Sequence, residues 1–102
     1  MIVHIGENIS LFGEDIVAIL DVDTVLKCKE TQNFINKLMK NDCLVNDIDK
    51  NVKSYIVATE GSTIINRKKI DRYKLYVSNI SSVSLLKRIN IDRLDWGKVN
   101  DK

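Results

Sequence analysis

The sequence predicts an α+β domain: a small antiparallel sheet of hairpins, packed with one central helix and a C-terminal helix. Three observations support this. The first 23 residues contain short β-branched runs between turn formers, which is typical of strands. Residues Thr31–Lys40 carry apolar side chains at helical spacing. A second pair of strand-like runs lies between Lys53 and Val77.

The size of the chain indicates one domain. With 102 residues and no proline, we expect a domain over residues 1–90 and a loosely ordered tail over 91–102. Such a chain buries a modest core, so self-association would stabilise it. The longest apolar run, Ile16–Leu20, is far too short to cross a membrane, and the N-terminus lacks the basic region of a signal peptide. We therefore expect a cytoplasmic protein without a membrane partner.

The net charge of +2 hides an asymmetry along the chain. Residues 1–26 contain five acidic residues and no basic one, whereas the remainder holds all 16 basic residues. A basic remainder is compatible with nucleic-acid binding without being diagnostic of it. The acidic segment can equally meet a basic face of a neighbouring copy.

The N-terminal segment predicts a hairpin followed by a core strand. Ile2–Ile5 and Ile9–Phe12 are expected to pair around a turn at Gly6-Glu7-Asn8. Gly13-Glu14-Asp15 forms a second turn. The nearly unbroken apolar run Ile16–Val22 then predicts a strand that is buried on both faces.

Two carboxylates stand at the end of this strand. Asp21 and Asp23 flank Val22 and would point to the same face. They suggest either a metal site or a strand end with the cap of a following helix, and we favour the second interpretation. Asp23 or Thr24 would then be the N-cap, and Thr31 is a further candidate.

The clearest helix is predicted over Thr31–Lys40. Its apolar residues fall on one face: Phe34, Ile35, Leu38 and Met39. We expect this stripe to pack across the sheet.

Three strand segments are expected after this helix. They are Cys43–Ile48, Lys53–Thr59 and a strand beginning at Thr63–Asn66, with a tight turn at Glu60-Gly61-Ser62 between the last two.

A final helix is expected to begin at a serine N-cap, Ser81 or Ser82. Its buried side would consist of Val83, Leu86 and Ile89.

The most basic stretch is Arg67–Lys74, which has five basic residues, one acidic residue and two interleaved apolar or aromatic ones. We expect it to form the loop at the tip of a second hairpin, because Leu75-Tyr76-Val77 is typical of a returning strand. A long basic hairpin can lie in a DNA groove or follow phosphates. It can equally be a solvated hairpin that protects a sheet edge. Both interpretations remain open.

The sequence contains no recognisable catalytic motif. His4, in a predicted strand, is expected to be a core or interface residue rather than a catalyst. Cys28 and Cys43 lack metal-ligand spacing, so we expect two reduced cysteines in or near the core. There is no glycine-rich phosphate loop and no nucleophile with an identifiable base. We therefore expect a protein that is not an enzyme and has no metal or cofactor.

The opening pattern resembles a known family. Residues 2–8, Ile-Val-His-Ile-Gly-Glu-Asn, followed by 15–21, Asp-Ile-Val-Ala-Ile-Leu-Asp, look like the start of the RemB proteins of Firmicutes, relatives of the extracellular matrix regulator RemA. The helix at 34–39, the strand at 53–59 and the segment 81–88 match in the same order. The resemblance implies a small bacterial regulator of biofilm genes. RemA-like members bind DNA upstream of matrix and osmoprotection genes, form rings and have a fold similar to the LytTR DNA-binding domain.

The chain departs from RemA at the DNA contact. In RemA-like proteins a pair of arginines just before the strand at 53–59 contacts DNA. The equivalent positions here are Asn51 and Val52, flanked by Lys50 and Lys53. Lysines neutralise phosphates as point charges, without the arginine fork. The stretch Arg67–Lys74 is also longer than the equivalent turn in RemA and would be able to take over the phosphate contacts.

The residues and the resemblance together predict a DNA-binding transcription regulator that acts as a homo-oligomer on double-stranded DNA. Seven basic residues would contact phosphates: Lys50, Lys53, Arg67, Lys68, Lys69, Arg72 and Lys74. The alternative is an oligomeric scaffold for protein interactions that does not bind DNA.

Overall fold

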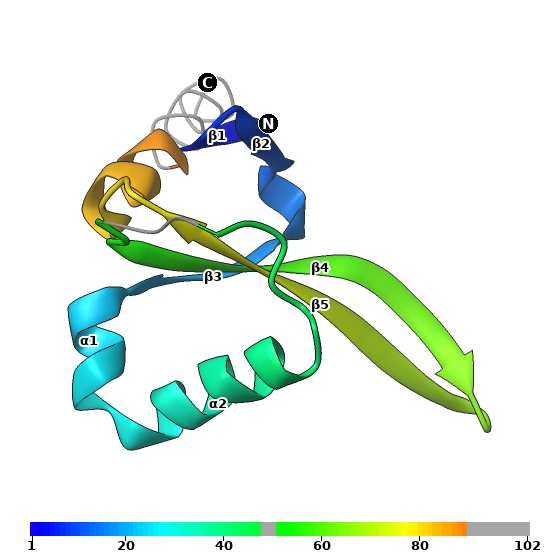
Figure 1. Cartoon of the computed structure of the whole chain (residues 1–102). Coiled ribbons are helices and arrows are strands. Elements are labelled where there is room, and N and C mark those ends of the chain that lie inside the picture. The colour runs from blue at the N-terminus through cyan, green and yellow to red at the C-terminus, as the bar shows by residue number, and fades with distance from the viewer. Residues whose placement is uncertain (48–50, 90–102) are drawn as a thin grey trace, which may run out of the picture.

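The computed structural model describes residues 1–47 and 51–89 (Figure 1). Lys50 and the predicted tail lie outside the described residues. The elements in chain order are β1 (Ile2–Gly6), β2 (Ile9–Phe12), η1 (Gly13–Asp15), β3 (Ile16–Asp21), α1 (Val22–Lys27), α2 (Lys29–Lys40), β4 (Ser54–Ile65) and β5 (Lys68–Ser78). A further helix covers residues 82–89.

The strands form two antiparallel sheets. β1 pairs with β2, and β3, β4 and β5 form a three-stranded sheet in that order. The predicted α+β class is therefore confirmed. Two helices, α1 and α2, stand where one central helix was expected. Extended backbone at Cys28, with φ −118° and ψ 108°, separates them.

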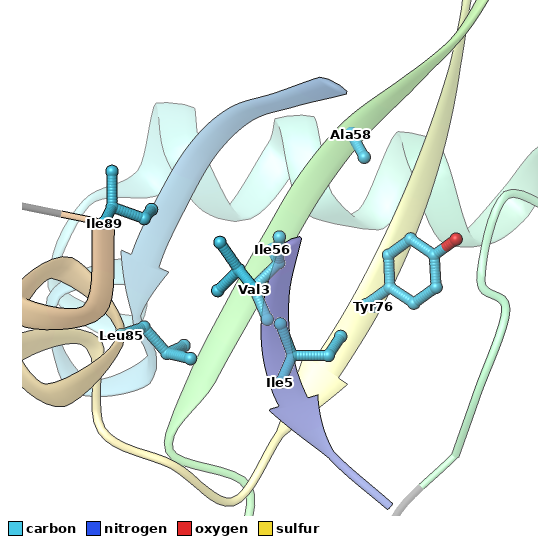
Figure 2. Close-up of a cluster of buried hydrophobic side chains, with 7 residues drawn as sticks. All are labelled: Val3, Ile5, Ile56, Ala58, Tyr76, Leu85 and Ile89. Carbon is cyan, nitrogen blue, oxygen red and sulfur yellow. The ribbon is translucent and has the colours of Figure 1, made fainter. Parts of the chain in front are cut away.

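The N-terminal hairpin forms as expected. Its turn has positive φ at both Glu7 (52°) and Asn8 (62°), which suits the twist of two closely joined antiparallel strands. The hairpin covers one face of the three-stranded sheet. Figure 2 shows Val3 and Ile5 of β1 over Ile56 of β4.

Hydrophobic clusters lie on both faces of the sheet, because successive side chains of β4 point to opposite sides. Ile56 and Ala58 belong to the cluster with β1 and the helix at 82–89 (Figure 2). Val57 packs on the other face with Val25, Ile35, Leu38 and Leu75, where α1 and α2 cover the sheet. β4 is thus the strand that is buried on both faces.

The prediction that the strand at 16–22 is buried on both faces is wrong. β3 is an edge strand that pairs with β4 on one side, and Val17 is 55% exposed. The central strand of the three-stranded sheet is β4, in which Ile56 and Val57 are fully buried.

In the segment predicted as a strand at Cys43–Ile48, the described residues 43–47 make a single parallel bridge, Leu44 to Leu75. The side chain of Asn46 extends this contact. Its Nδ2 donates to the Val77 carbonyl and its Oδ1 accepts from the Val77 N–H, both at 2.9 Å. The Asn46 carboxamide thus makes the two hydrogen bonds that the backbone of a neighbouring strand would otherwise make.

The predicted caps of the first helices are wrong by a few residues. Asp21 is the N-cap of α1, and its carboxylate accepts from the Thr24 N–H at 3.2 Å. Asp23 lies in the first turn of α1, so the two aspartates do not share a strand face. Asp21 ends β3 as expected, but it is also the cap, a position that was expected for Asp23 or Thr24. Thr31 lies inside α2, which begins at Lys29.

The last helix begins at a predicted cap, but its buried face differs from the prediction. Ser81 caps it, because its Oγ accepts from the Ser84 N–H at 3.2 Å. Leu85 and Ile89 are its buried residues, whereas Val83 and Leu86 are 60% and 45% exposed. Positions four apart share a helix face, and the sheet meets the face that carries Leu85 and Ile89.

Two buried serines form hydrogen bonds where β4 begins and β5 ends. Ser54 and Ser78 are opposite one another in the β4–β5 pairing, and neither is exposed to solvent. Ser54 Oγ donates to the Ile80 carbonyl at 2.7 Å. Ser78 Oγ donates to the Ile5 carbonyl at 2.6 Å and accepts from the Ile80 N–H at 3.0 Å. Ser78 therefore links β1 to β5 by a hydrogen bond.

We predict that Ser78→Ala destabilises the fold by about 2–3 kcal/mol, because it leaves the buried Ile5 carbonyl and the partly buried Ile80 N–H without this hydrogen-bond partner. The measurement is urea unfolding followed by circular dichroism. Ser10→Ala, at an exposed position of β2, serves as control and should change stability by less than about 0.5 kcal/mol. Equal effects of the two substitutions would contradict the role of Ser78.

Candidate nucleic-acid interface

The hairpin of β4 and β5 projects beyond the rest of the molecule. The strands pair from Ser54–Ser78 to Ile65–Lys68 and close in a two-residue turn, Asn66-Arg67, with φ 52° and 66°. Figure 1 shows the far end of this hairpin running clear of the helices. Residues 64–72 are all exposed. We call residues 61–72 the arm.

Two sequence predictions about this hairpin are wrong. Glu60-Gly61-Ser62 is not a turn, since β4 continues through it with a shift of register between Thr59 and Gly61. Arg67–Lys74 is not a loop, since residues 68–74 belong to β5. A glycine with φ +116° at Gly61 allows a bulge as readily as a turn, and the partner strand decides between them.

The alternation of side chains distributes the basic residues over both faces of β5. Lys68, Arg72 and Lys74 lie on the face that continues to Tyr76 and the β1 cluster. Lys69 lies on the opposite face, which continues to Leu75 and the α2 cluster. Arg67 stands in the turn between the faces. Asp71 shares the face of Lys69, so the excess of basic residues lies on the face of Lys68 and Arg72 and at the turn.

The charge of Lys74 is partly neutralised at the base of the arm. Its Nζ lies 3.3 Å from Glu60 Oε1. The arm itself contains four basic residues, Arg67, Lys68, Lys69 and Arg72, against one acidic residue, Asp71. The excess positive charge is thus concentrated near the tip.

Lys53 lies at the other end of the hairpin. Its N–H donates to the Ser78 carbonyl at 2.8 Å, and its carbonyl accepts from the Val22 N–H at 3.0 Å. Roughly 35 Å of strand separates it from the turn at Arg67. Within one subunit the structure brings together the basic residues of the arm but not Lys53.

Exposed isoleucines at the arm's tip are the feature that the sequence analysis missed. Ile64 is 75% exposed, Ile65 is 50% exposed and Ile70 is 43% exposed. The β-branched side chains of Ile64 and Ile65 correctly indicated a strand, whereas Ile70 was expected in a loop and lies in β5. The sequence pattern did not reveal that these side chains stay uncovered, because this depends on where the other elements pack.

A groove of about 540 Å³ lies between the C-terminal end of α2 and β5. Phe34, Leu38 and Tyr73 supply its apolar surface, and its charged residues carry both signs, among them Lys37 and Asp42. Because the lining carries both signs of charge, it indicates neither an anionic nor a cationic ligand.

His4 does not lie in the core, so its interface position stays a prediction, and the predicted environment of Cys28 is wrong. His4 is exposed on β1, with its Nδ1 3.4 Å from Ser10 Oγ. Both cysteines are free, but Cys28 is exposed and Cys43 only partly buried. In residues 1–47 and 51–89 no three potential metal ligands gather.

The thiol of Cys28 sits at the start of α2. Thr31 Oγ1 donates to its Sγ at 3.2 Å. This hydrogen bond, together with backbone donors of the first turn, lowers the pKa of the thiol below its ordinary value.

Comparisons with known proteins leave the chain without an assigned relative. No family model matches it, and neither the curated proteins nor the solved structures contain a significant match. None of the helices in the described part is long and apolar enough to cross a membrane.

We predict that Cys28 is alkylated by iodoacetamide at lower pH than an unstructured cysteine peptide, because a lowered pKa produces thiolate at lower pH. Mass spectrometry of a Cys43→Ser variant across a pH series measures this. Thr31→Val removes the hydroxyl donor and should move the midpoint to higher pH. An unchanged midpoint in that variant would contradict the role of Thr31.

We also predict that Gly61→Ala lowers the free energy of unfolding by about 1–2 kcal/mol, because a side chain at φ +116° is strained even though space is open around the glycine. Urea unfolding measures the change. Lys69→Ala, at an exposed position of the same hairpin, is the control and should stay within about 0.5 kcal/mol. A Gly61→Ala protein as stable as this control would contradict the strained bulge.

Proposed function

We propose that this protein is a DNA-binding transcription regulator of the RemA/RemB type that acts in the cytoplasm as a homo-oligomer. The single observation that carries the proposal is the arm, an exposed two-stranded ribbon with four basic residues against one acidic residue. The resemblance of its opening residues to RemB adds the class of target, genes of the extracellular matrix and biofilm.

The shape of the arm suits a duplex. Two-stranded ribbons of this kind lie in the major or the minor groove of B-DNA. Arg67, Lys68, Lys69 and Arg72 would contact phosphates, which supply most of the sequence-independent affinity. Lys74 is held by Glu60 and contributes less. Recognition would then depend on backbone charge and DNA shape more than on base edges.

Self-association would raise the affinity of so small a contact. One arm offers few cations, but two or more arms joined in one assembly bind the same duplex through effective concentration. Lys53 belongs to this proposal as a contact made by the body of a subunit, and Lys50 stays a predicted phosphate contact. Since Lys53 lies far from the arm of its own subunit, it would act beside the arm of another copy.

A scaffold without DNA binding is the second candidate. It is favoured by the acidic side chains of the N-terminal region, of which Glu7, Asp15 and Asp23 are exposed. These carboxylates are of the opposite charge to the arm, so the arm of one copy is able to meet the N-terminal region of the next.

We predict that the wild type binds bacterial promoter DNA with affinity that falls steeply with salt. Lys68→Ala with Lys69→Ala should reduce the slope of log K against log salt by about 1.8 for each bound arm, because each phosphate contact contributes about 0.9. Fluorescence anisotropy between about 50 and 200 mM salt measures the slope. The matched control is Lys27→Ala with Lys29→Ala, which removes two exposed lysines near the α1–α2 junction and should leave the slope unchanged.

The same lysines distinguish the two candidates. Charge reversal, Lys68→Glu with Lys69→Glu, should abolish DNA binding while the assembly mass measured by light scattering stays the same. A changed mass with unchanged DNA affinity would support the scaffold. A wild-type protein without salt-sensitive binding would contradict the DNA-binding proposal.

A further inference from the structure

We propose that the isoleucines at the tip of the arm insert between base steps of bound DNA and bend it. This inference rests on the proposed function and assigns the tip a second role besides phosphate contact. Its starting point is the exposure of Ile64 and Ile65, 75% and 50%, beside a run of three basic residues, Arg67-Lys68-Lys69, that begins in the turn. Nothing in the described part of the chain covers these side chains.

Each face of the tip combines an apolar residue with a cation. Ile64 is opposite Lys69 on one face, and Ile65 is opposite Lys68 on the other. Directly opposite residues of an antiparallel pair share a face with their side chains close together. An apolar wedge with a cation beside it matches DNA, in which the apolar faces of the bases lie between two rows of phosphates.

The arm is long enough for insertion. From the bulge at Gly61 to the turn the strands project roughly 16 Å, whereas the minor groove is about 7.5 Å deep. Exposure of residues 64–72 on both faces leaves the tip free of the body. Branched aliphatic side chains that enter the minor groove unstack a base step and bend the duplex by about 20–90°.

Charge disfavours a second arm as the partner of these isoleucines. The residue opposite each of them is a lysine, so two tips packed together would bring lysines against lysines. DNA instead neutralises the lysines while it buries the isoleucines. A nucleic acid is therefore the occupant that satisfies both residue types at once.

The experiment measures bending and binding separately. A duplex of about 30 base pairs carries a donor and an acceptor dye at its ends, so that bending raises energy transfer. The wild type should bind with a salt-dependent affinity and raise the transfer. Ile64→Ser with Ile65→Ser should abolish the rise in transfer but keep the salt slope, because every phosphate contact remains. Lys68→Ala with Lys69→Ala should instead reduce the slope.

Leu26→Ser is the control for loss of an exposed apolar side chain, since Leu26 lies on α1 and is 66% exposed. It should leave both readouts unchanged. A wild type that binds with a salt slope but leaves the transfer constant would overturn the inference and leave the proposed function standing. A wild type without any binding would overturn both. Loss of assembly mass in the isoleucine variant, with bending retained, would show that the tip contacts protein and would also overturn the inference.

Discussion

The pairing of β4 with β5 is the interaction on which the rest of the structure depends. Among the described strands β4 alone is paired on both of its edges, and its central residues Ile56, Val57 and Ala58 are buried. Each face of the domain packs against this pair. A two-stranded hairpin is only marginally stable by itself. The arm therefore depends for its folding on the part of the β4–β5 pairing that lies in the core.

The bulge at Gly61 divides this hairpin into two parts with different chemistry. Before it, β4 alternates between two hydrophobic clusters. Beyond it, both faces are exposed and basic residues dominate. A bulge adds a local bend and twist to the strand that contains it. The core therefore sets the direction of the arm, while the arm contributes nothing to the core.

Polar groups position the remaining elements around this hairpin. Ser78 holds the N-terminal hairpin by its hydrogen bond to Ile5, and Asn46 supplies amide contacts along the outer edge of β5. Toward the arm, the backbone contacts on this edge end at the hydrogen bond from the Leu75 N–H to the Cys43 carbonyl. The edge from Lys69 to Tyr73 therefore has no described partner strand. The charged residues on that edge also limit uncontrolled pairing with other chains, which agrees with the edge-protecting interpretation of the basic stretch.

Local sequence by itself determined the α+β class, the N-terminal hairpin and the presence of a basic stretch. It determined the apolar face of α2 in part, because Ile35 and Leu38 are buried whereas Phe34 and Met39 are exposed. Each depends on residues close together in the chain, such as the positive φ that Glu7-Asn8 adopts in a two-residue turn. Tertiary structure decided which strand is central, because β3 contains the longest apolar run, Ile16–Leu20, and still lies at the edge of the sheet. It also decided that Gly61 forms a bulge, that Lys53 lies far from Arg67, and that the tip isoleucines remain uncovered. These properties depend on which partners are available across the fold, and no window of neighbouring residues contains that information.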